Sequence, residues 1–178
     1  MMDLINTLVI VSAFVIIFLL WVAVGVRHLK RLHNEIVGQW ELVDEGLRKR
    51  HDLLPNLIET VRRFTDKQEE RIARTVAIRR EAAFEKKPSA KKIELEHDLS
   101  LVINELVDLG SDLKDLKRDT NFLELRKNID DLEQNIEDRT GKYNNMVRHY
   151  NKHRRLVLLR PLAAVWGFSR VNIFEIEK

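Results

Sequence analysis

The first strong pattern in the sequence is an unbroken apolar run of 23 residues that begins at Leu4 and ends at Val26. A helix of this length reaches about 34 Å at a rise of about 1.5 Å per residue, which is enough to cross the hydrocarbon core of a bilayer. Trp21 lies near the end of the run, where an amphipathic ring favours the headgroup region. The run predicts a single transmembrane helix.

The alternative for this run is a cleaved signal peptide, which needs a basic start, a shorter apolar region and a small-residue cleavage site. Here Asp3 precedes the run, and Arg27, Lys30 and Arg31 follow it closely. We therefore favour an uncleaved anchor over residues 1–27. Because the basic residues all follow the span, the positive-inside rule predicts that residues 27–178 lie in the cytoplasm.

After the anchor, apolar residues recur at intervals of three and four, which is typical of amphipathic helices that pack on one another. In the first part of this region the repeating positions are Ile36, Trp40, Val43, Leu47, Leu54, Leu57, Val61, Phe64, Ile72 and Val76. In the later part they are Leu95, Leu99, Val102, Leu106, Leu109, Leu113, Leu116, Phe122, Leu125, Ile129, Leu132, Ile136, Tyr143, Met146 and Tyr150.

Three places interrupt this pattern. At Pro55 either one long helix kinks, or a first helix ends near Asp52 and a second begins with the proline in its first turn; we favour the second interpretation. Residues 86–89 predict a turn in which Ser89 caps the next helix, and residues 119–121 predict another break and cap. Four segments with short connections predict an all-α fold, an antiparallel four-helix bundle over residues 28–155.

Polar residues occupy a few of the positions where the repeat calls for apolar ones, Arg50 and Arg139 among them. A buried guanidinium is costly unless it is paired, and the candidate partners are Glu69, Glu133 and Asp52. We interpret the set as a structural layer that fixes the register of the helices, with a binding or catalytic site as the alternative. Its members are Arg50, Gln68, Glu69, Glu133 and Arg139.

Residues 156–178 form a tail that is dense in apolar residues and punctuated by arginines. It is too short and too charged to span a bilayer. It caps the bundle, lies at the membrane interface or occupies the groove of a partner, since apolar surface rimmed by arginine suits each of these uses. Its candidate interaction residues are Leu158, Leu159, Trp166, Phe168 and Phe174.

Composition agrees with a helical protein and narrows the function classes. The 178 residues include only six glycines and three prolines, 33% are charged, and there is no cysteine, so disulfides and thiolate chemistry are excluded. The net charge of +3 suits a domain beside an anionic leaflet. A nucleic-acid module needs clustered basic residues with stacking aromatics, whereas the aromatics here lie mostly at the repeating positions, so we expect no nucleic-acid partner.

The sequence contains little that resembles a catalytic constellation. His149 and His153 are four residues apart and share a helix face, as a zinc pair does, but residues 150–152 supply no base and no third ligand is evident. His51 and Asp52 form a pair that we interpret as a helix end. There is no phosphate-binding glycine loop or nucleophile elbow. The sequence therefore predicts no enzyme, no cofactor and no metal, and a metal-dependent hydrolase is the least favoured hypothesis.

Two blocks of the sequence are similar to a known family. Residues 40–57 (WELVDEGLRKRHDLLPNL) resemble the signature of the LemA family of bacterial single-anchor membrane proteins, and a doubled Tyr-Asn within residues 143–151 resembles its second block. The resemblance covers nearly the whole chain. It departs from the family at Arg139-Thr140-Gly141, where Ala-Arg-Arg is usual, at residues 113–117, where Tyr-Pro-x-Leu-Lys is frequent, and at Arg160, where the tail commonly has Phe-Pro.

The resemblance implies a helical bundle in the bacterial cytoplasmic membrane, without an established enzymatic activity, in a family linked to envelope or stress biology and to HtpX-type membrane metalloproteases. We therefore expect a membrane-anchored scaffold or adaptor that forms homo-oligomers or binds an integral membrane protein such as a metalloprotease. The alternative is a lipid-organising protein that uses its tail together with Arg27, Lys30 and Arg31.

Overall fold

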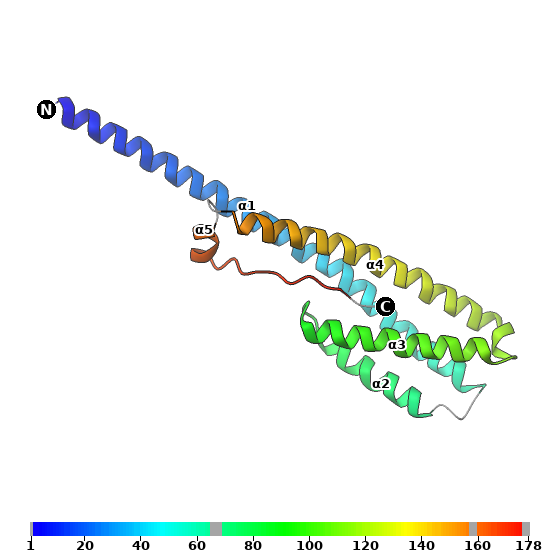
Figure 1. Cartoon of the computed structure of the whole chain (residues 1–178). Coiled ribbons are helices and arrows are strands. Elements are labelled where there is room, and N and C mark those ends of the chain that lie inside the picture. Colours follow the sequence, from blue (N-terminus) through cyan, green and yellow to red (C-terminus); the bar gives the residue numbers. More distant parts are fainter. Residues whose placement is uncertain (1, 65–68, 157–159, 176–178) are drawn as a thin grey trace. The chain divides into compact units, whose positions relative to one another are not determined.

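The computed structural model describes residues 2–64, 69–156 and 160–175 (Figure 1). Within these residues every regular element is a helix, so the all-α class predicted from the sequence is confirmed. The elements are α1 (Met2–Arg62), α2 (Glu69–Phe84), α3 (Ala90–Asp112), the 3-10 turn η1 (Leu116–Arg118), α4 (Thr120–Arg154) and α5 (Arg160–Val165).

The chain divides into two compact units, which we describe separately. Unit 1 comprises Met1–Val37 and Asn145–Val171, and unit 2 comprises Gly38–Asn144 and Asn172–Lys178. Helices α1 and α4 each contribute residues to both units.

Unit 1 contains the apolar start of α1, which is drawn in blue in Figure 1. The large apolar side chains described between Ile5 and Leu20 are all exposed. Among the described residues this is the one helix long and apolar enough to cross a membrane, which is compatible with a single membrane anchor. The buried apolar residues of unit 1 are Leu29, Ile36, Val147, Tyr150 and Ala163.

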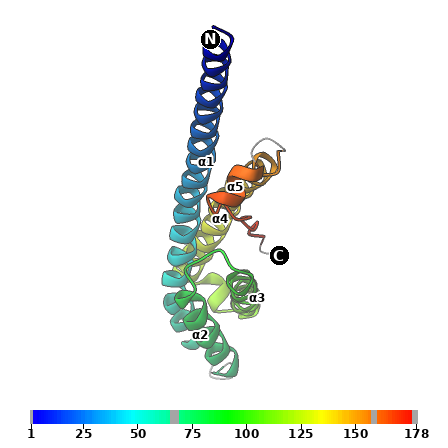
Figure 2. The same ribbon diagram turned by 90° about the vertical axis from the view of Figure 1, so that its left-hand side faces the viewer.

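Unit 2 has a hydrophobic core to which α1, α2, α3, η1 and α4 all contribute, and Figures 1 and 2 show α2 and α3 running beside one another. Many positions of the predicted repeat are buried in it. These positions are Leu54, Leu57, Val61, Ile72, Leu95, Leu99, Val102, Leu106, Leu116, Phe122, Leu125 and Ile129.

Leu109, Leu113 and Leu132 are partly buried, and three positions of the repeat are exposed: Phe64 at 39%, Val76 at 49% and, in unit 1, Met146 at 37%. The reason at the first two is that α1 ends at Arg62 and α2 begins at Glu69, so the register of one helix does not continue into the other. In α2 the buried side chains are instead Ile72, Thr75 and Ala82.

The favoured break at Pro55 is wrong, because α1 continues through this proline (Figure 2). A proline inside a helix donates no hydrogen bond to the carbonyl four residues earlier. Here that carbonyl belongs to His51, and it accepts a hydrogen bond of 2.7 Å from Nε of Arg79 in α2. A side chain of another helix therefore replaces the donor that Pro55 lacks.

This contact gives a testable prediction for stability. We expect Arg79→Ala to lower the free energy of unfolding by about 1–2 kcal/mol, because the His51 carbonyl then loses its donor. In a Pro55→Ala background, the amide of residue 55 can donate to the same carbonyl, so the cost of Arg79→Ala should fall by at least half. Denaturant titration of the four proteins measures the difference, and equal costs in both backgrounds would contradict this role of Arg79.

The two other predicted helix boundaries are confirmed. Ser89 is the N-cap of α3 and its hydroxyl accepts a hydrogen bond from the backbone N–H of Lys92. Asp119 accepts one of 2.8 Å from the N–H of Phe122 at the start of α4. Each side chain satisfies a backbone donor that the first turn leaves open.

Gly46 marks a close approach of α1 and α4 in unit 2. A Cβ atom at this position would lie 2.9 Å from Cγ1 of Ile136, closer than side-chain carbons pack. The absence of a side chain at Gly46 therefore allows the two helices to come together at this level.

Candidate functional site

The centre of unit 2 contains a network of buried charges that starts from Arg50 in α1. Its guanidinium donates hydrogen bonds to a carboxylate oxygen of Glu96 in α3 and, at 2.9 Å, to Glu133 in α4. It also donates to the hydroxyl of Ser100 at 2.6 Å. Arg50 and Glu96 are almost completely buried, whereas 29% of the Glu133 side chain is exposed.

Glu96 is the shared anion of this network. Besides Arg50, it contacts Nε2 of His51 at 3.1 Å and Nζ of Lys92 at 3.0 Å through its two oxygens. Lys92 also donates to the carbonyl of Ala82 at 3.1 Å. Three nitrogen-bearing side chains from two helices therefore converge on one carboxylate.

The ionisation of these groups follows from this arrangement. Burial by itself would raise the pKa of Glu96, but the hydrogen bond with His51 and the charges of Arg50 and Lys92 outweigh burial and lower the pKa to about 2. Burial would likewise lower the pKa of Arg50, and the charges of Glu96 and Glu133 raise it instead. Glu96 and Arg50 are therefore both ionised at neutral pH.

The lowered pKa of Glu96 predicts a pH dependence of stability. Its ordinary value is 4.5 and its value in the folded chain is about 2, so the contribution of Glu96 is complete above about pH 4.5 and is lost as the pH falls toward 2. The difference corresponds to about 3 kcal/mol in the free energy of unfolding. Urea titrations over this pH range should show a decline in the free energy of unfolding, and Glu96→Gln should make that decline smaller.

The matched control for that experiment is Glu59→Gln. Glu59 pairs with Arg63 four residues away, and both side chains are largely exposed. Exposed pairs contribute little, so the control should keep the decline of the parent chain. If Glu59→Gln flattened the decline in stability as much as Glu96→Gln does, the acid sensitivity would come from the overall charge of the chain and not from Glu96.

The structure brings together only some of the predicted polar layer. Arg50 and Glu133 meet as expected. Glu69 instead pairs with Arg62 at 3.0 Å on the surface, Asp52 is exposed, and Gln68 lies outside the described residues.

The partners expected for Arg139 are wrong. Its guanidinium donates to the carbonyl of Leu42 at 2.6 Å and to Glu45 at 3.2 Å. It lies six residues beyond Glu133 along α4, or about 9 Å, which is too far to share the partners of Arg50. Arg139 therefore does not belong to the buried network.

Sequence reasoning missed the residues that complete the network. The sequence does contain a signal for them. A polar stripe runs along α3 beside the leucine repeat at intervals of four residues, formed by Lys92, Glu96 and Ser100. The sequence predicts His51 at a helix end, but it lies inside α1 because the helix does not stop at Pro55.

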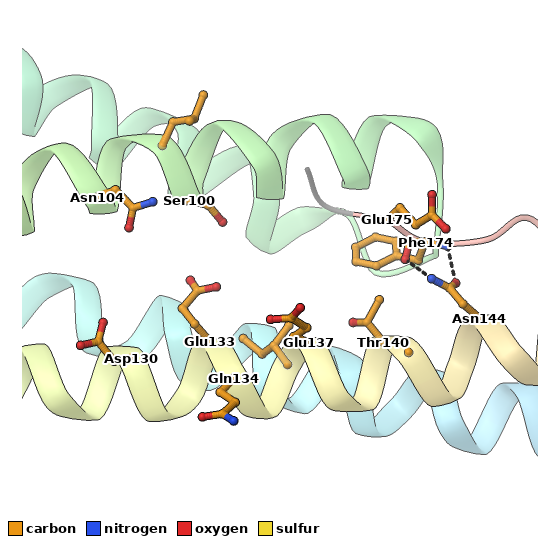
Figure 3. Close-up of a pocket in the computed structure, with 13 residues that line it drawn as sticks. Ser100, Asn104, Asp130, Glu133, Gln134, Glu137, Thr140, Asn144, Phe174 and Glu175 are labelled. Atoms are coloured by element: carbon orange, nitrogen blue, oxygen red, sulfur yellow. Dashed lines mark hydrogen bonds between the residues drawn. The ribbon is translucent and has the colours of Figure 1, made fainter. Parts of the chain in front are cut away.

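The tail is held by two Tyr-Asn pairs of α4, one in each unit. In unit 2, Asn144 binds the backbone of Phe174 twice: Nδ2 donates to the carbonyl and Oδ1 accepts from the N–H, both at 2.7 Å (Figure 3). The hydroxyl of Tyr143 donates to the carbonyl of Asn172 at 3.2 Å. These contacts bind the backbone of the tail.

The same pattern recurs in unit 1. Asn151 donates to the carbonyl of Val171 at 2.7 Å and accepts from its N–H at 3.3 Å, and the hydroxyl of Tyr150 donates to the carbonyl of Ser169 at 3.1 Å. Arg154 donates to the carbonyl of Phe168 at 3.4 Å. We call Tyr143, Asn144, Tyr150 and Asn151 the tail clamps.

An aromatic cluster reinforces the clamp of unit 2. The ring of Trp40 lies 5.5 Å from that of Tyr143 and 4.9 Å from that of Phe174, measured between centroids, and its Nε1 donates to the carbonyl of Lys86. Burial raises the pKa of Tyr143 to about 12, so its hydroxyl remains a donor over the physiological range. Phe174, a predicted interaction residue, is completely buried here.

The other predicted tail residues are placed as follows. Phe168 is partly buried and donates its N–H to the carbonyl of Ala163 at 2.9 Å. Half of Trp166 is exposed. Leu158 and Leu159 lie outside the described residues.

The residues predicted to anchor and flank the membrane helix all lie in α1 within unit 1. Trp21 is partly buried, with its ring 5.8 Å from that of Phe18, and Val26 is partly buried. The basic flank is exposed, and Arg31 pairs with Glu35 at 3.0 Å. The remaining members of the predicted set are Leu4, Arg27 and Lys30.

The histidine pair lies at the end of α4 in unit 1. The rings of His149 and His153 have centroids 4.1 Å apart, and that of His28 lies 5.4 Å from His153. His153 uses Nδ1 in a contact of 2.9 Å with the carbonyl of His149. Across the described ranges, no group of three histidine or carboxylate side chains has the arrangement of a metal site.

Comparison with known proteins identifies the relatives of the chain. The sequence profile of the LemA family matches residues 39–178, which include the buried network, both tail clamps and the tail itself. No curated protein matches the chain.

Proposed function

The chain belongs to the LemA family, and from this premise we propose that it is a membrane-anchored scaffold that assembles through its tail. The observation that carries the proposal is the binding of the tail backbone by the asparagines of the tail clamps. The exposed apolar start of α1 supports an anchor in a membrane, which we propose is the bacterial cytoplasmic membrane, with the polar part on its cytoplasmic side.

We further propose that the polar part is an antiparallel four-helix bundle. Contacts of α1 with α4 support this arrangement, because they run in opposite order along the two helices. Gln39 donates to the carbonyl of Arg139, while Arg50 contacts Glu133.

A tail that is held through its backbone is suited to exchange between copies. Each asparagine offers one donor and one acceptor to an extended segment, which is how sheet edges and peptide grooves bind their ligands. The tail of a second copy can satisfy the same clamps without new side-chain contacts, as in domain swapping. The scaffold would then link protomers through their tails, and an integral membrane protein with an exposed extended segment could take the same place.

The test is the mass of the full-length chain in lipid nanodiscs, compared with the variant Asn144→Ala/Asn151→Ala. We expect a nanodisc to hold more than one copy of the parent chain. The variant should be monomeric, with unchanged helix content. Asn145→Ala is the matched control, since Asn145 is an exposed neighbour. A monomeric parent chain isolated without any stoichiometric membrane partner would contradict the scaffold.

A second candidate function is lipid organisation, which one observation favours. At the end of α5 in unit 1, Val165 is 76% exposed and Trp166 is 50% exposed, and Arg170 follows Trp166 by four residues in the sequence. Aromatic and basic residues together suit a membrane interface. If the tail enters that interface, lipid-borne quenchers should reduce the fluorescence of the parent chain more than that of Trp166→Ala. Equal quenching would rule this function out.

A further inference from the structure

Unit 1, which contains the exposed apolar start of α1, is strongly basic. It includes nine lysines and arginines against two acidic residues, Asp3 and Glu35, which gives a formal charge of +7. The other 22 basic and 26 acidic residues belong to unit 2, whose formal charge is −4. The net charge of +3 for the whole chain therefore conceals a large difference between its two units.

The basic residues of α1 follow directly after its apolar run. Arg27 is next to Val26, the last residue of the run, and Lys30 and Arg31 lie within about 8 Å of Val26 along the helix. The headgroup region adds about 5–8 Å to each side of the hydrocarbon core of a bilayer. With α1 across a bilayer, these side chains therefore lie at the level of the lipid headgroups.

The end of α4 reaches the same level, because it packs against this part of α1. Within unit 1 the ring of His33 lies 5.9 Å from that of Tyr150, and the ring of His28 lies 5.4 Å from that of His153, measured between centroids. These contacts run in opposite order along the two helices. Since His28 is two residues past Val26, the last turn of α4 also lies at the level of the headgroups.

The last turn of α4 supplies further positive charge and no negative charge. Lys152 and Arg155 are exposed, and residues 145–156 contain no acidic residue. Of the two carboxylates in unit 1, Glu35 already pairs with a basic residue of α1, and Asp3 lies at the opposite end of the apolar run. Unit 1 therefore has no further carboxylate to balance Lys152 and Arg155.

We propose that Arg27, Lys30, Lys152 and Arg155, which we call the basic collar, bind the headgroups of anionic phospholipids. All four side chains are exposed, and they come from two helices that pack against each other where the apolar run ends. An anionic leaflet attracts basic residues that lie beside a membrane span, and the attraction grows with their number. A zwitterionic headgroup carries no net charge, so the collar selects lipids that are negative overall.

The position of the basic collar identifies this partner. The apolar part of α1 brings the bilayer to the collar, so lipid phosphates are the anions concentrated around these side chains. A basic flank on α1 alone would be explained by the orientation of the membrane helix. Lys152 and Arg155 flank no span in the sequence, and the fold brings them to this level. The inference does not rest on assembly through the tail.

The experiment uses the full-length chain in phosphatidylcholine bilayers that contain trace amounts of spin-labelled lipid. Electron paramagnetic resonance separates lipids held at the protein surface from bulk lipids, and so gives the affinity for phosphatidylglycerol relative to phosphatidylcholine. We expect phosphatidylglycerol to bind at least about threefold more tightly. Equal affinities of the two lipids for the parent chain would overturn the proposal.

The collar variant is Lys152→Ala/Arg155→Ala, which should reduce this preference to about half of the parent value or less. The matched control Lys127→Ala/Lys142→Ala removes the same charge from exposed positions of α4 in unit 2, and it should leave the preference unchanged. All four side chains are exposed, so both variants should keep the helix content of the parent chain. An equal loss in both variants, or no loss in the collar variant, would overturn the proposal.

Two further measurements identify the source of the preference. Salt at about 1 M shortens the screening length to about 3 Å and should abolish the preference, whereas a preference that survives would come from the acyl chains and overturn the proposal. Glycerol phosphate in solution should not compete with phosphatidylglycerol. Competition would show that the basic collar binds a soluble phosphate ester instead of a lipid.

A last comparison separates this inference from the two proposed functions. Trp166→Ala should keep the preference for phosphatidylglycerol, because it removes no charge; loss of the preference would assign lipid selection to the tail and overturn the proposal. A parent chain that is monomeric and still prefers phosphatidylglycerol would contradict the scaffold and support the basic collar. The two proposals therefore fail independently.

Discussion

Replacing Glu96 with leucine should lower the free energy of unfolding by about 3–5 kcal/mol, the cost of breaking a buried ion pair by removing one partner. The substitution leaves Arg50 and Lys92 buried without their shared carboxylate. Arg50 keeps Glu133, Ser100 and the backbone carbonyl of residue 96. Lys92 keeps the carbonyl of Ala82 and an ion pair of 3.7 Å with Asp44. Denaturant titration at neutral pH measures the loss.

Two comparisons test whether this cost comes from unpaired charge. Glu133→Gln should be milder, since the Glu133 side chain is partly exposed and water can approach it. The double variant Arg50→Leu/Glu96→Leu should cost clearly less than the sum of its single variants, because it removes both members of the pair. Additive costs, or a loss below about 1 kcal/mol for Glu96→Leu, would show that the network does not act as a unit.

Replacing Trp40 with alanine should lower the free energy of unfolding by about 3–5 kcal/mol, as for other large aromatic residues in a core. The substitution removes the ring that contacts both Tyr143 and Phe174 and the donor to the carbonyl of Lys86. Because Phe174 then loses its packing partner, the tail should also loosen. Hydrogen exchange at the Phe174 amide, which Asn144 holds in the parent chain, should become faster.

The variant Trp40→Phe separates packing from hydrogen bonding. It keeps an aromatic ring and loses the N–H donor, so we expect a cost of about 1–2 kcal/mol and little change in exchange at Phe174. Trp166→Ala is the surface control, because half of that side chain is already exposed. Exchange at Phe174 that stays slow in Trp40→Ala would mean that Asn144 alone holds the tail.

The two variants report on different parts of unit 2. Glu96→Leu removes a core group that does not contact the tail. Trp40→Ala should both lower the stability of the core and weaken binding of the tail. Both variants should remain folded in the absence of denaturant. If assembly proceeds through the tail, Trp40→Ala should weaken assembly under these conditions and Glu96→Leu should not.

Features set by neighbouring residues could be predicted from the sequence. The apolar start of α1 follows from an uninterrupted run, because any helix of that composition exposes apolar side chains on every face. The caps at Ser89 and Asp119 bond to amides three residues away, so their geometry is local. The repeat located most of the core, since a period near 3.5 fixes which side of a helix is apolar.

Features that depend on distant residues were decided only by the tertiary structure. Pro55 stays inside a helix because Arg79, from another helix, supplies the missing donor. Arg50 pairs with Glu96, 46 residues away in the sequence, and not with Glu69. The Tyr-Asn pairs were visible in the sequence, but their ligand, the backbone of the tail, has no side-chain signature. Periodicity specifies the faces that helices bury, whereas the partner that each polar group finds depends on which faces meet.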